Sequence, residues 1–159
     1  MVCADTRFEG MLWGHTRRDG WRATDGLIAL VTGSKFRDQI DVMLLDGIAL
    51  GGFNVVDLPR LHEAVGVPCA AVMRRHPDMA AVHAAIARLP RPARRLAVLA
   101  RAGAIHAEAP FVFQVAGCDA ATMARALRVA TREGHVPEAL RMAHLIGSAV
   151  MRGESSRRA

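Results

Sequence analysis

The residue best placed for chemistry is Asp46, which ends an apolar run at residues 42–45 and directly precedes Gly47. An apolar run that is bounded by turn residues and lies between helix-like segments predicts a buried strand of an α/β sheet. Sites in such sheets gather at the carboxyl ends of the strands. Asp46 is therefore a candidate catalytic residue. From this motif alone, a turn aspartate before glycine is an equally good interpretation.

A basic pair, Arg74 and Arg75, follows a second apolar run at residues 68–73. A strand, a helix and a strand joined by short connections predict a parallel pair with a right-handed crossover. Arg74 and Arg75 would then lie at the same sheet edge as Asp46, where arginine suits phosphate binding. Charged residues are also common at the solvated ends of strands, so a purely structural role stays open.

A glycine-containing loop and two isolated polar residues complete the candidates. Asp25 falls in the first turn of a helix predicted over residues 23–31, where favourable contact with exposed amides is sufficient to explain a negative charge. His144 borders the apolar side of a helix predicted over residues 138–150, and taken alone it is more often a structural histidine than a catalytic one. The loop follows Asp46 closely and combines flexible backbone with an aromatic ring; its residues are Gly51, Gly52, Phe53 and Asn54.

Periodicity and turn residues divide the rest of the chain into further strands and helices. Strands are predicted at residues 2–5 and 8–16, around a tight turn, and at residues 109–116. A helix is predicted to begin after Asp57 and to end at Gly66. The other predicted helices cover residues 79–89, 93–102 and 120–130.

Composition indicates one reduced, globular domain with a basic surface. The 159 residues are 52% hydrophobic, and Lys35 is the only lysine among 21 basic residues, which give a formal charge of +6. This balance favours a polyanionic partner such as nucleic acid, although an arginine bias of the genome would also explain it. Three scattered cysteines and the lack of a long apolar run predict a cytoplasmic protein with no membrane contact. The domain is expected to span residues 1–152, followed by a basic, disordered tail at 153–159.

Several motifs together carry a family resemblance that covers nearly the whole chain. They are Leu45-Asp46-Gly47-Ile48, Gly51-Gly52-Phe53-Asn54-Val55-Val56-Asp57, Leu61-His62-Glu63, Val72-Met73-Arg74-Arg75 and Val136-Pro137-Glu138-Ala139-Leu140-Arg141-Met142-Ala143-His144-Leu145. This set resembles the archaeal and bacterial endonuclease dU family, which is related to endonuclease V. The resemblance implies a ribonuclease H-like α/β fold, with three antiparallel strands, then two parallel strands, and helices on both faces of a mixed sheet.

The resemblance also implies roles for individual residues. Asp46 matches the family's strand-end aspartate, Asp25 its helix-start carboxylate and His144 its late-helix histidine. Asp46 and Asp25 would bind Mg²⁺ or Mn²⁺, and Arg74 or Arg75 is the nearest equivalent of a lysine in endonuclease V. The loop at residues 51–54 would let the backbone approach a nucleic-acid strand, with Phe53 to stack on a base. The implied activity is metal-dependent hydrolysis of phosphodiester bonds in nucleic acid, expected to be DNA, near a deaminated base such as deoxyuridine.

The beginning of the chain departs from the family pattern. These families start with a strand that carries an aspartate, and neither Asp5 nor Glu9 fits that position. Asp25 is also shorter than the glutamate usual at its place. Loss of the first strand would remove a bridging metal ligand and leave central strand edges unpaired, so we expect the true start codon to lie upstream. The alternative is a catalytically impaired homologue that only binds nucleic acid.

Overall fold

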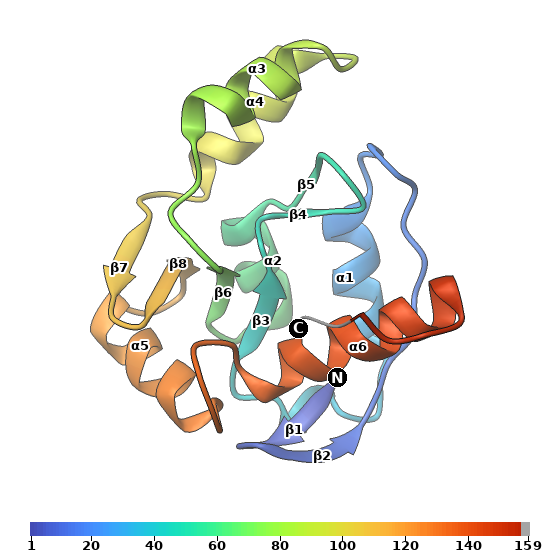
Figure 1. The fold of residues 1–159 in the computed structure, drawn as a ribbon, viewed down its shortest axis with the longest axis vertical. Helices are drawn as coiled ribbons and strands as arrows, with labels where there is room; N and C mark the ends of the chain where they lie inside the picture. The colour runs from blue at the N-terminus through green and yellow to red at the C-terminus, as the bar shows by residue number, and fades with distance from the viewer. Residues whose placement is uncertain (157–159) are drawn as a thin grey trace.

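A four-stranded mixed sheet in the order β3-β6-β8-β7 forms the centre of the computed structural model, which describes residues 1–156 (Figure 1). The strands β3 (Met43–Asp46) and β6 (Cys69–Met73) run parallel, and α2 (Leu58–Val65) connects them. This confirms the predicted parallel pair. β8 (Phe111–Ala116) then pairs antiparallel with β6, and β7 (His106–Glu108) pairs antiparallel with β8.

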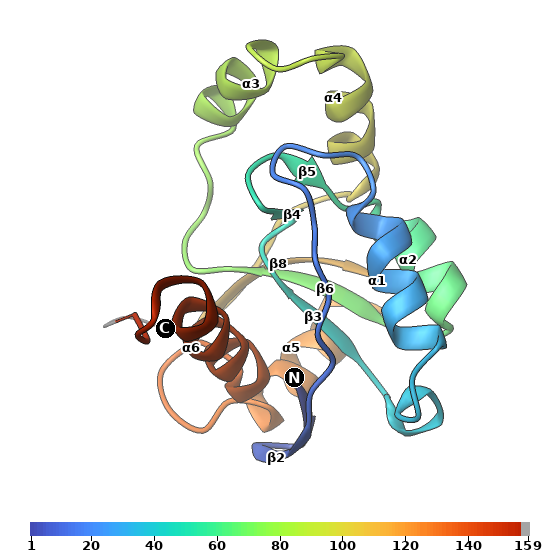
Figure 2. The same cartoon turned by 90° about the vertical axis from the view of Figure 1, so that its right-hand side faces the viewer.

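Helices cover both faces of this sheet, as expected from the resemblance. α1 (Ala23–Thr32) and α2 lie on one face, while α5 (Ala120–Val129) and α6 (Glu138–Arg152) lie on the other (Figure 2). Strand alternation builds a core on each side: Met43 and Leu45 pack with α1 and α2, whereas Val42 and Leu44 pack with α5 and α6. Asp46 follows the alternation of Val42 and Leu44, so it lies on the face that carries α6.

Two helices form a hairpin beyond the end of the sheet (Figures 1 and 2). α3 (Met79–Ala87) is capped by Asp78, whose carboxylate accepts a hydrogen bond from the Ala81 amide at 3.0 Å. α4 (Pro92–Arg101) has proline in its first turn, where its missing N–H has no helical partner to lose. α4 contacts β5 (Asn54–Val55), which pairs with β4 (Ala49–Leu50) in a small ribbon that sequence analysis did not predict.

The N-terminal strands differ from the prediction. β1 (Val2–Ala4) and β2 (Arg7–Gly10) form a hairpin that, within residues 1–156, is not hydrogen-bonded to the four-stranded sheet. The predicted strand at 8–16 is therefore wrong beyond Gly10. The following segment has no neighbouring strand among the described residues and bonds to the glycine loop instead, through the Asp19 amide and the Gly51 carbonyl at 2.8 Å. Within the described residues, β3 pairs only with β6 and is therefore an edge strand of the four-stranded sheet.

The C-terminal helix ends at Gly153, whose φ of +84° terminates it in the left-handed region. The Ser155 hydroxyl donates to the Leu145 carbonyl at 3.2 Å. The tail predicted to be disordered is thus placed as far as residue 156, and residues 157–159 lie outside the described residues. None of the helices in the described part of the chain is long and apolar enough to cross a lipid bilayer.

Candidate functional site

The centre of the candidate site is a pair formed by Asp46 and His144. The His144 Nδ1 atom lies 3.6 Å from an Asp46 carboxylate oxygen, and the two side chains are 35% and 44% exposed, respectively. Asp46 is held at the sheet edge because the next amide, that of Gly47, donates to the Val72 carbonyl at 2.8 Å. His144 lies one helical turn after Leu140, which is buried against the sheet. Two residues that are 98 positions apart therefore meet at the carboxyl end of β3.

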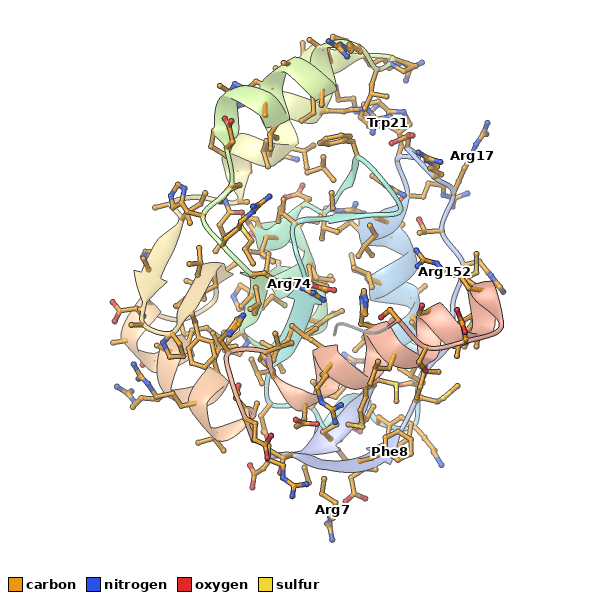
Figure 3. The ribbon with its side chains drawn as sticks, viewed as in Figure 1. Arg7, Phe8, Arg17, Trp21, Arg74 and Arg152 are labelled. Carbon is orange, nitrogen blue, oxygen red and sulfur yellow. The ribbon has the colours of Figure 1, made fainter. Side chains whose placement is uncertain are left out.

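The basic pair lies at the end of the neighbouring strand. Arg74 and Arg75 follow β6 directly, and both are exposed. Figure 3 shows Arg74 near the middle of the view, between α6 and the β4–β5 ribbon. Within residues 1–156 neither guanidinium has a hydrogen bond or an ion pair, so both are free to bind an anion. Arg74 and Arg75 therefore lie at the same end of the sheet as Asp46, as the predicted parallel pair of strands implied.

Asp25 has a different partner. Its carboxylate forms an ion pair with Arg60 of α2, at 2.6 Å, and both side chains are substantially exposed. α1, which carries Asp25, covers the face of the sheet opposite to the one that Asp46 faces. The structure therefore joins Asp25 to Arg60, and no described contact joins it to Asp46 or His144.

The glycine loop is tied to the segment that precedes α1. Gly51 and Gly52 have φ values of +55° and +84°, and a Cβ at Gly52 would lie 2.3 Å from a carboxylate oxygen of Asp19. The same oxygen accepts a hydrogen bond from the Phe53 amide at 2.8 Å. These contacts fix the backbone that presents the Phe53 ring.

Asn54 supports this loop from inside. It is 1% exposed, accepts a hydrogen bond from the Ala23 amide at 3.1 Å and donates to the Thr16 hydroxyl at 2.7 Å. Asn54 was predicted as part of the nucleic-acid-binding loop. Its side chain instead holds the start of α1 and the neighbouring segment in place, and only the other three loop residues reach the surface.

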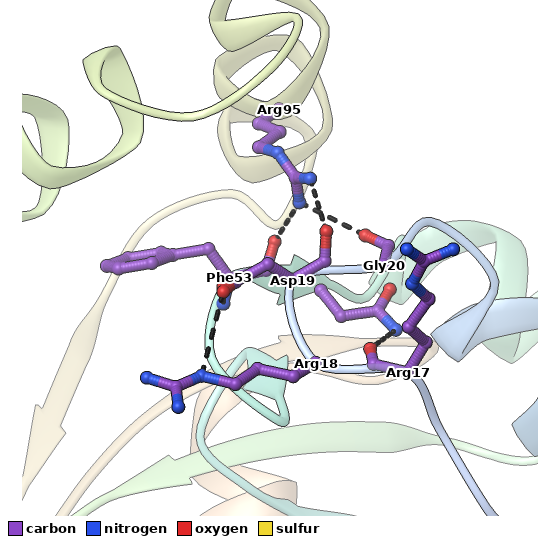
Figure 4. A network of polar contacts seen from close by, with 7 residues as sticks. Arg17, Arg18, Asp19, Gly20, Phe53 and Arg95 are labelled. Carbon is purple, nitrogen blue, oxygen red and sulfur yellow. Dashed lines mark hydrogen bonds and ion pairs between the residues drawn. The ribbon is translucent and has the colours of Figure 1, made fainter.

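Arg95 was not among the predicted site residues, although it is the largest fully buried side chain within residues 1–156. Its guanidinium donates to the carbonyl oxygens of Asp19, Gly20 and Phe53 (Figure 4). Its Nε donates to the carbonyl oxygen of Pro90. The sequence did contain a signal. Residue 95 shares a helical face with two buried apolar positions, at intervals of four and seven: Leu99 and Ala102.

The residues present fit one divalent cation better than two. Mg²⁺ is commonly held by one or two carboxylates together with water and substrate phosphate, and the exposed carboxylate of Asp46 can serve as such a ligand. Among residues 1–156 no three His, Cys, Asp or Glu side chains gather closely enough to hold a metal ion. A second ion would need a further carboxylate to move towards Asp46.

These features define an α/β protein with a carboxylate and a histidine at the carboxyl end of a parallel strand, flanked by free arginines. Residues 1–151 match the model of the family described as Endonuclease dU, and the chain belongs to this family. The resemblance inferred from the motifs is thereby confirmed.

Relatives in archaea share most of the chain. A UPF0215 protein of Thermococcus kodakarensis is 44% identical over 142 residues, which are 87% of this chain and 72% of the relative. A UPF0215 protein of Archaeoglobus fulgidus is 39% identical over 147 residues, or 92% of this chain and 81% of the relative. A crystal structure of a protein of unknown function from Archaeoglobus fulgidus DSM 4304 superimposes with a TM-score of 0.91 at 37% identity, covering 94% of this chain and 87% of that one.

Proposed function

We propose that this protein is an endonuclease that hydrolyses phosphodiester bonds in DNA near a deaminated base such as deoxyuridine. The observation that supports this most directly is the contact between Asp46 and His144 at the strand end, in a chain of the Endonuclease dU family. Asp46 and His144 are far apart in the sequence, so chain connectivity alone does not bring them together. Core packing does not explain their contact either, because both side chains are partly exposed.

Each candidate residue has a proposed task. Asp46, with Asp25 as the second proposed ligand, would hold Mg²⁺ or Mn²⁺, and the metal would activate water and stabilise charge on the phosphate. His144 would orient or protonate the leaving oxygen. Arg74 or Arg75 would bind a phosphate through the planar fork of its guanidinium. The backbone at Gly51 and Gly52 would approach the strand, and Phe53 would stack on a base.

The test replaces the strand-end carboxylate. We expect Asp46→Asn to lower Mg²⁺-dependent cleavage of uracil-containing DNA by about a hundredfold or more, because even indirect supports of metal ligands are worth about 10- to 100-fold. Asp41→Asn is the matched control, since Asp41 is exposed just before the same strand. Equal cleavage by wild type and Asp46→Asn would contradict the assignment of Asp46.

Mn²⁺ titration of the same proteins adds a readout that does not depend on turnover. Asp25→Asn should weaken Mn²⁺ binding as Asp46→Asn does if Asp25 leaves Arg60 to ligate the ion. Unchanged Mn²⁺ affinity in Asp25→Asn would restrict the metal site to Asp46.

A second candidate function is nucleic-acid binding without cleavage. The ion pair between Asp25 and Arg60, at 2.6 Å, favours it because this pairing leaves Asp46 without a second carboxylate in the described structure. This candidate predicts salt-sensitive binding of nucleic acid and no metal-dependent cleavage by the wild-type protein. The cleavage assay above therefore separates the two functions.

A further inference from the structure

A cavity of about 260 Å³ lies between α2, α4 and the start of α1. It is on the side of the sheet opposite to Asp46 and His144, because α1 and α2 cover that face. Four arginines and one tryptophan dominate its lining: Trp21, Arg60, Arg94, Arg95 and Arg101. We call it the arginine cavity.

The arginine cavity has more positive charge than its carboxylates can neutralise. Arg101 forms an ion pair with Asp57, and Arg60 pairs with Asp25. The buried Arg95 guanidinium contacts only carbonyl oxygens and the Trp21 ring, so no carboxylate among the described residues neutralises it. A buried charge without a counter-ion raises the local potential and favours an anion nearby.

Arg94 supplies the donors that such an anion would need. It is exposed, and its guanidinium carbon lies 5.1 Å from the centre of the Trp21 ring. Within residues 1–156 it makes no hydrogen bond or ion pair. Contact with the indole restrains the guanidinium, while its N–H groups stay available for a phosphate.

The surroundings favour a strand over a small free anion. The volume is below the roughly 300–1,000 Å³ of typical small-molecule sites, so the cavity itself has room for one phosphate and part of its sugar, free or within a strand. Trp21 and Arg95 also line an adjoining cavity of about 980 Å³, whose other basic residues include Arg17, Arg18 and Arg22. Arginines outnumber the carboxylates of Asp19 and Asp25 in the lining of this adjoining cavity, so positive charge continues past the arginine cavity, as an extended polyanion requires.

We infer that the arginine cavity binds a phosphate group of a single-stranded nucleic acid, with Arg94 as the main donor, at a place separate from Asp46 and His144. The inference rests on the proposed function only in taking nucleic acid as the partner. Cleavage at Asp46 is not needed for it.

The experiment measures binding without turnover. Asp46→Asn protein that also carries Trp13→Phe is titrated in EDTA with oligothymidine, thymidine monophosphate or inorganic phosphate, and Trp21 fluorescence reports occupancy. We expect Arg94→Gln to weaken oligothymidine binding about fivefold and to reduce the slope of log affinity against log salt by about 0.7, which is the loss of one phosphate contact on a single strand. The matched control is Arg88→Gln, which removes an exposed charge from the same helical hairpin outside the cavity.

Two results would overturn the inference. Equal effects of Arg94→Gln and Arg88→Gln would mean that only net charge matters. An effect of Arg94→Gln on free phosphate or thymidine monophosphate, with oligothymidine binding unchanged, would make the ligand a small anion and not a strand. Either result is independent of the cleavage assay, so failure of this inference and failure of the proposed function can be told apart.

Discussion

At the scale of single residues, Cys69 gives the protein a measurable dependence on pH. It begins β6, is completely buried, and burial raises the pKa of its thiol from 9.0 to about 12. The unfolded chain therefore loses this proton at a lower pH than the folded chain does. The free energy of unfolding should fall as pH rises from about 9 towards 12, by at most about 1.4 kcal/mol per pH unit.

Urea unfolding of a Cys3→Ser, Cys118→Ser protein at a series of pH values from 8 upwards measures this slope. Adding Cys69→Ala lowers stability at every pH because it leaves a cavity, but it should also remove the downward slope above pH 9. A slope that persists without Cys69 would assign the pH dependence to another group.

The position of a site residue was predictable where chain topology determines it. Asp46 and Arg74 were placed at one edge because a short crossover makes their strands parallel, and His144 came from the family motif. The partner of Asp25 was not predictable, since nothing local marks Arg60 as the residue that faces it across α1 and α2. Arg95 was missed because an arginine on a helix is normally solvated.

At the scale of elements, Arg95 fixes the helical hairpin to the loops beside the site. Arg95→Met would keep much of the side-chain volume and remove every donor to the carbonyls of Asp19, Gly20, Phe53 and Pro90. We expect a loss of about 3 kcal/mol, because buried acceptors left without a donor cost about 1–3 kcal/mol and charged networks cost more. Thermal unfolding should shift down by roughly 6 to 12 °C for a chain of this size.

The local consequence distinguishes this role from general core packing. Hydrogen exchange should accelerate in residues 16–20 and 51–54 of Arg95→Met and change little in β6 and β8. Arg88→Met is the control, because that side chain is exposed on the same hairpin. Uniformly faster exchange across the sheet would show that Arg95 supports the whole core and not these loops.

Helices and strands were predictable where residues within the same segment determine them, and not where distant residues do. Helices expected at 23–31 and 138–150 occur at Ala23–Thr32 and Glu138–Arg152, because the apolar periodicity lies within each segment and a glycine directly follows it. The segment after Gly10 was predicted as a strand from its bulky residues. Its real partners are Gly51 and Asn54, more than 30 residues away, and a window of local sequence does not contain them.

At the scale of the whole molecule, the formal charge of +6 has two competing explanations, a binding surface and an arginine-rich composition. Arg74 and Arg75 stand without ion pairs beside Asp46, whereas Arg125 and Arg128 lie on α5, where they bond to Thr122 and Ala109. The two arginine pairs carry the same charge, but only the pair at residues 74 and 75 lies beside Asp46 without hydrogen-bond partners in the described structure.

Neutralising either pair lowers the formal charge by the same amount, but we expect only the loss of Arg74 and Arg75 to weaken binding. We expect Arg74→Gln with Arg75→Gln to weaken single-stranded DNA binding about tenfold and to reduce the salt slope by about 1.4, the value for two lost phosphate contacts. Arg125→Gln with Arg128→Gln should leave both quantities nearly unchanged. Fluorescence anisotropy over a range of salt concentrations measures both, in EDTA so that cleavage does not interfere. Similar losses in the two double variants would mean that total charge, and not the edge beside Asp46, attracts nucleic acid.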